Sequence, residues 1–145
     1  MSQPRRILQV VWSLAPGGLE RVACQLARCT ADLGVSHAMV CLHGGGSFEA
    51  LLPKGTPVTV AGTSGDDLAG AAAIHQAARR FEADAIHAHN WACWPAGALA
   101  GIRSGLPVVW TLHGWDTDRP MSRKRRLACH WLAKATSAMT AVSRE

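Results

Sequence analysis

Short apolar runs alternate along the chain with longer stretches in which apolar residues recur every three or four positions. Apolar runs rich in branched residues predict buried strands, and the three- and four-residue spacing predicts helices with one apolar face. The predicted strands are 7–13, 38–42, 58–61, 85–88, 108–112 and 139–142. The predicted helices are 19–33, 47–52, 66–81, 91–104 and 122–135.

Residues within and before these stretches refine the prediction. Asp66 begins the third predicted helix, and an aspartate is a typical N-cap at that position. Pro95 interrupts the fourth, so its regular part is expected after the proline. The face of the first helix that packs on the sheet is predicted to contain Leu19, Val22, Ala23, Leu26 and Leu33.

Strictly alternating strands and helices are typical of one fold class. They predict an α/β, Rossmann-like domain in which a doubly wound parallel sheet carries helices on both faces. Right-handed crossovers join the strands. The length of 145 residues suits one core, so we expect a single domain over 1–145.

Composition, cysteine pattern and charge indicate the class of protein and where in the cell it is expected. Hydrophobic residues make up 48% of the chain and charged residues 17%, which excludes a disordered polymer. Five cysteines without a Cys-x-x-Cys pair favour neither a disulfide framework nor a thiolate zinc site. With no secretory or membrane-spanning signal in the sequence, we expect a cytoplasmic protein. The net charge of +5 comes with no nucleic-acid-binding motif, so nucleic acid is not an expected partner.

Candidate chemistry gathers where strands are predicted to end. Ligands of open parallel sheets bind beyond the carboxyl ends of the strands, at the point where strand order reverses. In the common doubly wound order the loops after the first and fourth strands flank that point, and the loop after the fifth lies beside them. These loops carry Gly17-Gly18, His89-Asn90-Trp91 and His113-Gly114-Trp115-Asp116.

Two classes of site are disfavoured at these loops. Gly17 and Gly18 allow backbone conformations closed to other residues, at a helix start that could hold a phosphate, and an ordinary tight turn is the alternative interpretation. The full Gly-x-Gly-x-x-Gly pattern is absent, however, and no acidic residue follows the second strand, which argues against a dinucleotide dehydrogenase. His87, His89 and His113 lack a carboxylate at matching spacing, so no metal is expected.

Four motifs in register then carry a family resemblance. The segment 15–21 resembles the Gly-Gly-x-Glu-Arg turn and helix of family 4 glycosyltransferases, and 84–89 resembles their Asp-x-x-His-x-His strand. The segment 107–116 is similar to their Pro-x-Val-x-Thr-x-His-Gly-x-Asp motif, and 140–143 to the strand that closes their N-terminal domain. Together these motifs span nearly the whole chain.

The resemblance implies the N-terminal, acceptor-side half of a two-domain GT-B glycosyltransferase. Such enzymes transfer a sugar from a nucleotide-diphosphate sugar to an acceptor, generally with retention and without a metal or other cofactor. Most donor contacts come from a C-terminal domain with a paired-glutamate segment, which is not among these residues. The expected partners are therefore that donor-binding domain or subunit and a sugar or lipid-linked acceptor of glycan, glycolipid or exopolysaccharide synthesis.

The resemblance also assigns candidate residues. His113 would lie beside the transferred sugar and stabilise the charge that develops at the anomeric carbon. The residues expected to contact donor or acceptor are Gly17, Gly18, His89, Asn90, Gly114 and Asp116. For His113 a turn-capping role, and for Asp116 a place in a surface turn, stay open as alternatives.

A basic run opens the last predicted helix. Arg123, Lys124, Arg125 and Arg126 precede an apolar stripe, which favours contact with an anionic membrane surface at the inner face of the membrane. A solvated helix face is the other interpretation. For the whole chain the alternative function is a non-catalytic, acceptor-binding or membrane-recruiting subunit of a split GT-B transferase.

Overall fold

The computed structural model describes residues 5–63, 65–114 and 121–142. Its strands are β1 (Arg6–Val11), β2 (Ser36–Cys41), β3 (Val58–Val60), β4 (Ala85–His89), β5 (Val108–Leu112) and β6 (Ala138–Ala141). Its helices are α1 (Gly18–Ala31), α2 (Asp67–Phe81), α3 (Asn90–Ser104) and α4 (Arg123–Lys134), with a short 3-10 helix, η1 (Ser47–Leu51).

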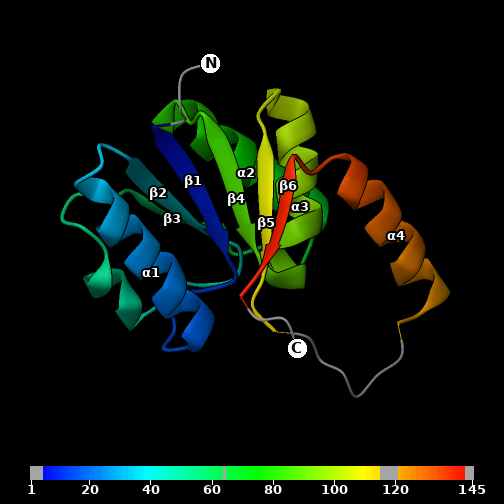
Figure 1. Ribbon diagram of the computed structural model, residues 1–145, viewed down its shortest axis with the longest axis horizontal. Helices are drawn as coiled ribbons and strands as arrows, with labels where there is room; N and C mark the ends of the chain where they lie inside the picture. The colour runs from blue at the N-terminus through cyan, green and yellow to red at the C-terminus, as the bar shows by residue number, and fades with distance from the viewer. Residues whose placement is uncertain (1–4, 64, 115–120, 143–145) are drawn as a thin grey trace.

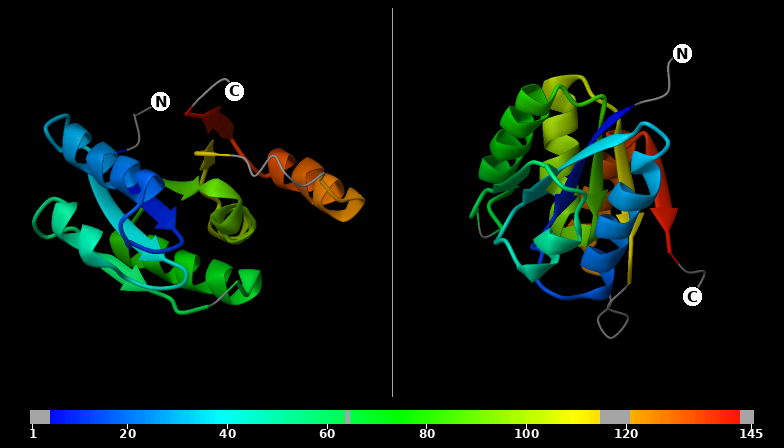
Figure 2. Two further views of the ribbon diagram at one scale, coloured as in Figure 1. Left: turned by 90° about the horizontal axis from the view of Figure 1, so that it is seen from below. Right: turned by 90° about the vertical axis from the view of Figure 1, so that its left-hand side faces the viewer.

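All six strands form one parallel sheet in the order β3-β2-β1-β4-β5-β6. Strand order reverses between β1 and β4, so successive crossovers run toward opposite edges from there (Figure 1). Right-handed crossovers then place helices on both faces. Figure 2 shows α1 on one face and α2 and α3 on the other. The predicted fold class is confirmed.

The two faces of the sheet bury different sets of side chains. Toward α2 and α3 the core contains alternate residues of the central strands, among them Leu8, Val40 and Ile86. Toward α1 a smaller core contains Val11, Met39 and Cys41 together with small residues of the helix. Because side chains of a strand alternate between faces, residues 9, 37, 87 and 89 also lie on the α1 side.

Helix α3 sits close to the sheet because its inner face is small. A methyl group at Gly97 would meet the Ala88 side chain at 2.9 Å, and one at Gly101 would overlap Val108. At the other end of the helix, the rings of Trp94 and Trp110 stack with centroids 3.9 Å apart. Small residues and one aromatic pair thus fix the position of α3 over β4 and β5.

Two predictions about helices were wrong in detail. In α1 the buried residues are Ala23, Cys24 and Ala27, whereas Val22 is 41% and Leu33 77% exposed. Side chains of alanine and cysteine let the helix approach the sheet more closely than the predicted large residues would. Helix α3 begins at Asn90 and continues through Pro95, because packing of its first turns outweighs the missing proline N–H.

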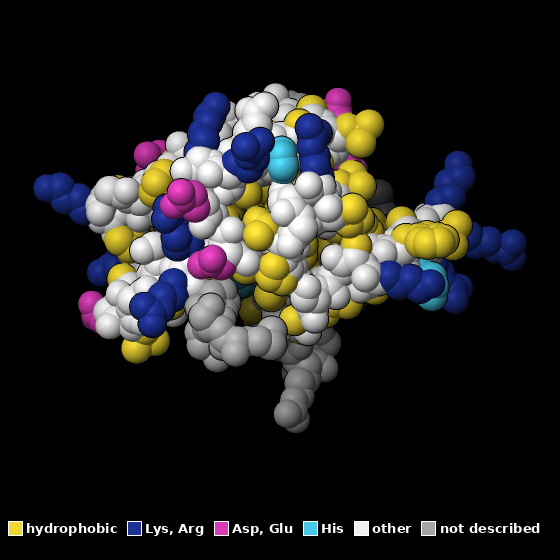
Figure 3. All heavy atoms as spheres, turned by 90° about the horizontal axis from the view of Figure 1, so that it is seen from above, with side chains coloured by type: hydrophobic (Ala, Val, Ile, Leu, Met, Phe, Trp, Pro, Cys, Tyr) yellow, Lys and Arg dark blue, Asp and Glu magenta, His cyan; other side chains and the backbone are white. Residues whose placement is uncertain are grey.

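Helix α4 lies beside the main body of the domain. Cys129, Leu132 and Ala133 pack against the core on the α2 side, while the remainder of the helix faces outward. Figure 3 shows basic and hydrophobic side chains next to one another on this projecting part. The Ser122 hydroxyl caps the helix by accepting a hydrogen bond from the Arg125 N–H at 3.2 Å.

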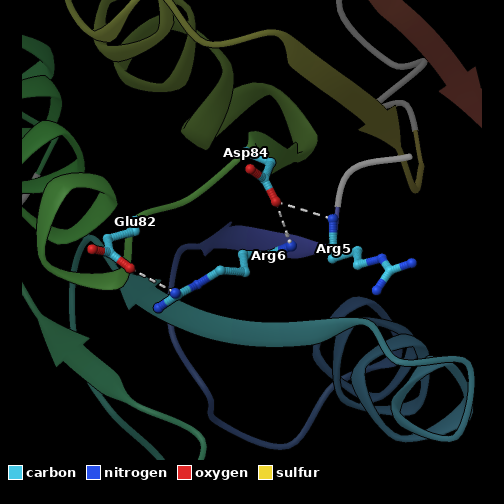
Figure 4. Close-up of polar contacts among 4 residues, drawn as sticks. All are labelled: Arg5, Arg6, Glu82 and Asp84. Atoms are coloured by element: carbon cyan, nitrogen blue, oxygen red, sulfur yellow. Dashed lines mark hydrogen bonds and ion pairs between the residues drawn. The ribbon is translucent and has the colours of Figure 1, made fainter. Parts of the chain in front are cut away.

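The amino ends of β1 and β4 are joined by polar contacts (Figure 4). The Asp84 carboxylate accepts hydrogen bonds from the backbone N–H groups of Arg5 and Arg6, each at 3.0 Å. The Arg6 guanidinium also forms an ion pair with Glu82 at 2.7 Å. Asp84, which belongs to a motif of the family resemblance, therefore has a structural role at the edge opposite the predicted site.

Replacing Asp84 tests this junction. We expect Asp84→Ala to lower the free energy of unfolding by about 1–2 kcal/mol, because two backbone donors lose a charged acceptor. Glu82→Gln should change it by less than about 0.5 kcal/mol, because an exposed ion pair contributes little. Urea unfolding of both variants measures the difference, and equal losses would contradict the assigned role of Asp84.

Candidate functional site

The predicted site residues come together at the carboxyl edge of the sheet. The turn before α1, the start of α3 and the end of β5 all lie at this edge, below the strands in the view of Figure 1. It is the edge where strand order reverses between β1 and β4, with β5 adjacent to β4. The loops that the sequence singled out therefore share one side of the molecule.

The turn at Gly17 and Gly18 leads into α1. Gly17 is extended, with φ −169°, and neither glycine has a positive φ, so other residues could adopt these conformations. A side chain at Gly17 would meet only the flexible carboxylate of Glu20, and one at Gly18 would meet open space. The conformational freedom that glycine allows is therefore not used at this turn. What the turn provides is an unobstructed helix start, where unpaired N–H groups favour an anion.

Two neighbours position His113, which follows β5. Its backbone N–H donates to Asn90 Oδ1 at 3.0 Å, and its ring Nε2 lies 2.7 Å from Nδ1 of His89. Both partners come from the end of β4 and the start of α3. His113 is itself half-buried and Gly114 is exposed, so the histidine is fixed from beneath while the following residue faces solvent.

His89 lies deeper than a ligand contact would require. Its side chain is 1% exposed, and its second ring nitrogen lies 2.6 Å from Gln9 Oε1. Both ring nitrogens therefore have partners within the domain. A direct contact of His89 with a ligand stays a prediction, and in this structure the side chain supports His113.

Asn90 has an unusual backbone conformation, which lets its side chain reach His113. Its φ is +61°, in the left-handed region that asparagine tolerates better than most residues. From there its side chain reaches His113, and its carbonyl oxygen accepts a hydrogen bond from Trp110 Nε1 at 2.9 Å. Asn90 thus connects α3 to two positions of β5 and its following loop.

Burial keeps the histidines of this edge neutral. Desolvation lowers the pKa of His113, and the nearby Glu20 carboxylate opposes this by raising it. Desolvation lowers the pKa of His87 to about 4, assisted by the positive charge of protonated His113. The pKa of His89 lies well below its ordinary value, mainly because the ring is buried. At neutral pH these rings act as hydrogen-bonding groups without charge.

Sequence reasoning missed Gln9 and the charge of Glu20. Gln9 is fully buried, and a polar residue inside the apolar run of the first strand was the available signal. The Glu20 carboxylate raises the pKa of His113 and lies against Gly17. Asp116 lies outside the described residues, so its contact with donor or acceptor stays a prediction.

No group of three or more His, Cys, Asp and Glu side chains in the described ranges could hold a metal ion. A hollow of about 630 Å³ lies at the amino ends of β1 and β2, far from His113, between the last turns of α1 and α2. We assign the site to the carboxyl edge despite that hollow, because this edge brings together the helix start and the connected polar side chains.

A doubly wound parallel sheet with polar loops at its reversal point is a Rossmann-like architecture, of the kind found in each half of a GT-B glycosyltransferase. The chain belongs to glycosyltransferase family 4, whose family model matches residues 16–145.

The fold is similar to that of MurG from Acinetobacter baumannii, with a TM-score of 0.66 at 13% sequence identity. The similarity covers 95% of this chain and 41% of the MurG chain. At this identity the similarity concerns the fold alone. A comparison with curated proteins gives no match.

Replacements of Asn90 separate its side chain from its backbone. We expect Asn90→Ala to cost about 2 kcal/mol of unfolding free energy, because alanine loses the acceptor for His113 and strains the left-handed backbone. Asn90→Gly removes only the acceptor and should cost about half as much, while Asn90→Asp keeps both features and should be close to native. Thermal and urea unfolding rank the three variants, and a native-like Asn90→Gly would exclude the side-chain contact.

Stability should fall in acid through the buried histidines. Their pKa values are lower in the folded than in the unfolded chain, so unfolding takes up protons and stability rises with pH. For His87 this window runs from about 4 to the ordinary value near 6.5, and it corresponds to about 3 kcal/mol. Urea unfolding across this range should show a shallower pH dependence for His87→Asn than for the native chain. Parallel curves would contradict the prediction.

Proposed function

We propose that the chain forms the acceptor-side half of a glycosyltransferase that uses a nucleotide-diphosphate sugar. In the transfer the bond between the anomeric carbon and the diphosphate oxygen breaks, and a bond to an acceptor oxygen forms as its proton leaves. A donor-binding half completes the cleft opposite the carboxyl edge, whether it belongs to the same polypeptide or to a separate subunit. Transfer proceeds with retention and without a metal.

The placement of His113 is the observation that carries this proposal. His113 lies at the reversal-point edge and is held by Asn90 from α3 and by His89 from β4. Its lowered pKa keeps it neutral at physiological pH, so it contributes a hydrogen bond beside the transferred sugar. The open helix start at Gly18 provides N–H groups for the diphosphate or for a phosphorylated acceptor.

The test compares the chain with a complete enzyme. The chain alone should give no sugar transfer with any nucleotide sugar, because the donor must be enclosed by two domains. When it is joined or mixed with a donor-binding family 4 half, transfer should appear. Sustained transfer by the chain alone would overturn the two-half proposal. No transfer despite tight association would favour the alternative, a non-catalytic acceptor-binding subunit of a split transferase.

In such a complete enzyme His113→Ala should lower kcat on the order of a hundredfold, because one hydrogen bond in the transition state is lost. The matched control is His75→Ala, because His75 bonds to Ser104 near the opposite edge of the sheet. Steady-state kinetics and thermal unfolding measure both variants. Near-native kcat in a folded His113→Ala enzyme would reduce His113 to a turn residue.

A second proposal concerns recruitment to an anionic membrane. On α4, Leu127 is 61% and Trp131 63% exposed, opposite the side that packs on the core. The exposed basic residues Arg123 and Lys124 lie near these apolar side chains, and the Lys134 ammonium lies 5.1 Å from the centre of the Trp131 ring. Exposed apolar side chains among cations are typical of helices that lie in a membrane interface.

The four cations of the basic run do not share the same surroundings. The Arg125 guanidinium lies 4.3 Å from the centre of the Trp91 ring, so this residue takes part in packing α4 onto α3. Contact with lipid therefore rests on Arg123, Lys124 and Arg126 with the two exposed apolar residues. A cytoplasmic protein would meet a lipid-linked acceptor of glycan or glycolipid synthesis at the inner face of the membrane. No helix in the described ranges is long and apolar enough to cross a bilayer.

Vesicle co-sedimentation tests the membrane proposal. Changing Arg123, Lys124 and Arg126 to Gln should weaken binding to anionic vesicles on the order of a hundredfold, at about 1 kcal/mol for each cation. A control with the same loss of charge changes the exposed residues Arg28, Lys54 and Arg80 to Gln, and should bind nearly as the native chain does. Equal binding by all three proteins would leave the basic run as a solvated helix face.

A further inference from the structure

A row of hydrogen-bonded side chains runs across the α1 face of the sheet beneath the site. From its far end, Thr30 Oγ1 lies 2.8 Å from Nε2 of His37, and Nδ1 of His37 lies 3.1 Å from Gln9 Nε2. Gln9 Oε1 then meets His89, and His89 meets His113. The proposed function uses His113 and the supporting His89, so the role of Thr30, His37 and Gln9 is unexplained.

Thr30 determines which atom of each pair along the row donates and which accepts. The Thr30 hydroxyl has one proton and donates it to the carbonyl oxygen of Leu26, one helical turn earlier, at 2.7 Å. Toward His37 this hydroxyl can therefore only accept, so Nε2 of His37 must carry the proton. Nδ1 of a neutral His37 is then an acceptor and takes a hydrogen bond from the Gln9 amide NH₂.

Gln9 on β1 carries this order of donors and acceptors from His37 on β2 to His89 on β4, along the same face of the sheet. With its NH₂ toward His37, its oxygen faces His89 and can only accept, so Nε2 of His89 carries a proton. Nδ1 of a neutral His89 is left as an acceptor toward His113. Each step leaves a single arrangement of donors and acceptors, because two facing donors or two facing lone pairs would repel each other.

We propose that Thr30, His37, Gln9 and His89 form a one-way hydrogen-bond relay that positions His113 and fixes it as an Nε2–H donor to His89. The Nδ1 lone pair of a neutral His113 is then its remaining polar atom, an acceptor for a hydroxyl group of the ligand. Thr30, His37 and Gln9 are positioning residues, because they act on the ligand only through His89 and His113.

Burial makes the relay specific. Gln9 is 0%, His89 1% and His37 6% exposed, so water cannot replace a broken hydrogen bond without a large rearrangement. Desolvation also lowers the pKa values of His37 and His89, which keeps one donor and one acceptor on each ring. Because an amide side chain does not pass on a proton, Gln9 makes the row a positioning device and not a proton wire.

The direction of the relay rests on these contacts, whereas its consequence for transfer rests on the proposed function of His113. The experiment therefore begins with the chain alone and without any sugar. Long-range ¹H–¹⁵N correlation spectra of the histidine rings, recorded above pH 7, report which nitrogen of each ring carries the proton. We expect His37, His89 and His113 all to be protonated at Nε2.

Variants of Gln9 and Thr30 test whether the order of donors and acceptors along the row determines the tautomer of His113. Gln9→Met keeps the shape of the side chain but frees His89, so His89 can turn from acceptor to donor toward His113. The ratio of the Nδ1–H to the Nε2–H form of His113 should then rise roughly threefold to tenfold, as expected for the loss of one hydrogen bond. Thr30→Val should change the ratio in the same direction. Thr30→Ser keeps the hydroxyl and should give the native ratio.

The relay would be overturned by an Nδ1–H form of His89 or His113 in the native chain. A native tautomer ratio of His113 in a folded Gln9→Met chain would overturn it equally, and Thr30→Val decides if the methionine variant does not fold. The proposed function is tested separately by transfer in the complete enzyme. If the native chain gives the expected spectra but the complete enzyme with His113→Ala is fully active, the proposed function is refuted and the relay is unaffected.

Discussion

The hydrogen bond between Gln9 and His89 joins β1 to β4 where the strand order of the sheet reverses. Both side chains are buried, and a buried polar group that loses its partner costs about 1–3 kcal/mol. The two strands must therefore keep one register and one distance at this point. Because the ends of β1 and β4 carry the turn before α1 and the residues that hold His113, this contact adds a side-chain constraint to the backbone pairing of the two strands beneath the candidate site.

The two faces of the sheet have different physical roles. On the α2 side, apolar residues pack closely with the small inner face of α3 and with the stacked Trp94 and Trp110. On the α1 side, the polar row lies among apolar and small residues, and among the described residues no buried side-chain nitrogen or oxygen lacks a hydrogen-bond partner. One face supplies stability through packing, and the other holds a defined set of donors and acceptors at the site.

In the proposed enzyme the candidate site is one wall of a cleft between two halves. His113 is fixed from below by Asn90 and His89, while Gly114 and the helix start at Gly18 face outward. Rigid support beneath an exposed surface suits a half-site that acts against a second surface, because its groups need no rearrangement when the cleft closes. The outward face of α4 offers a separate surface, whose exposed Trp131 and cations are independent of His113.

The sequence by itself determined the alternation of strands and helices, the strand-end loops and the four motifs, because periodicity and turn residues are local properties. Strand 108–112 and the Asp66 cap were predicted correctly for that reason. Ala23 was predicted to face the sheet, but only the tertiary structure decided that Cys24 and Ala27 do so and that Val22 does not, since the depth of a helix depends on what packs beneath it. It also decided that Gln9, 80 positions from His89, contacts it, because hydrogen bonds between strands depend on strand order and register, which no local pattern contains.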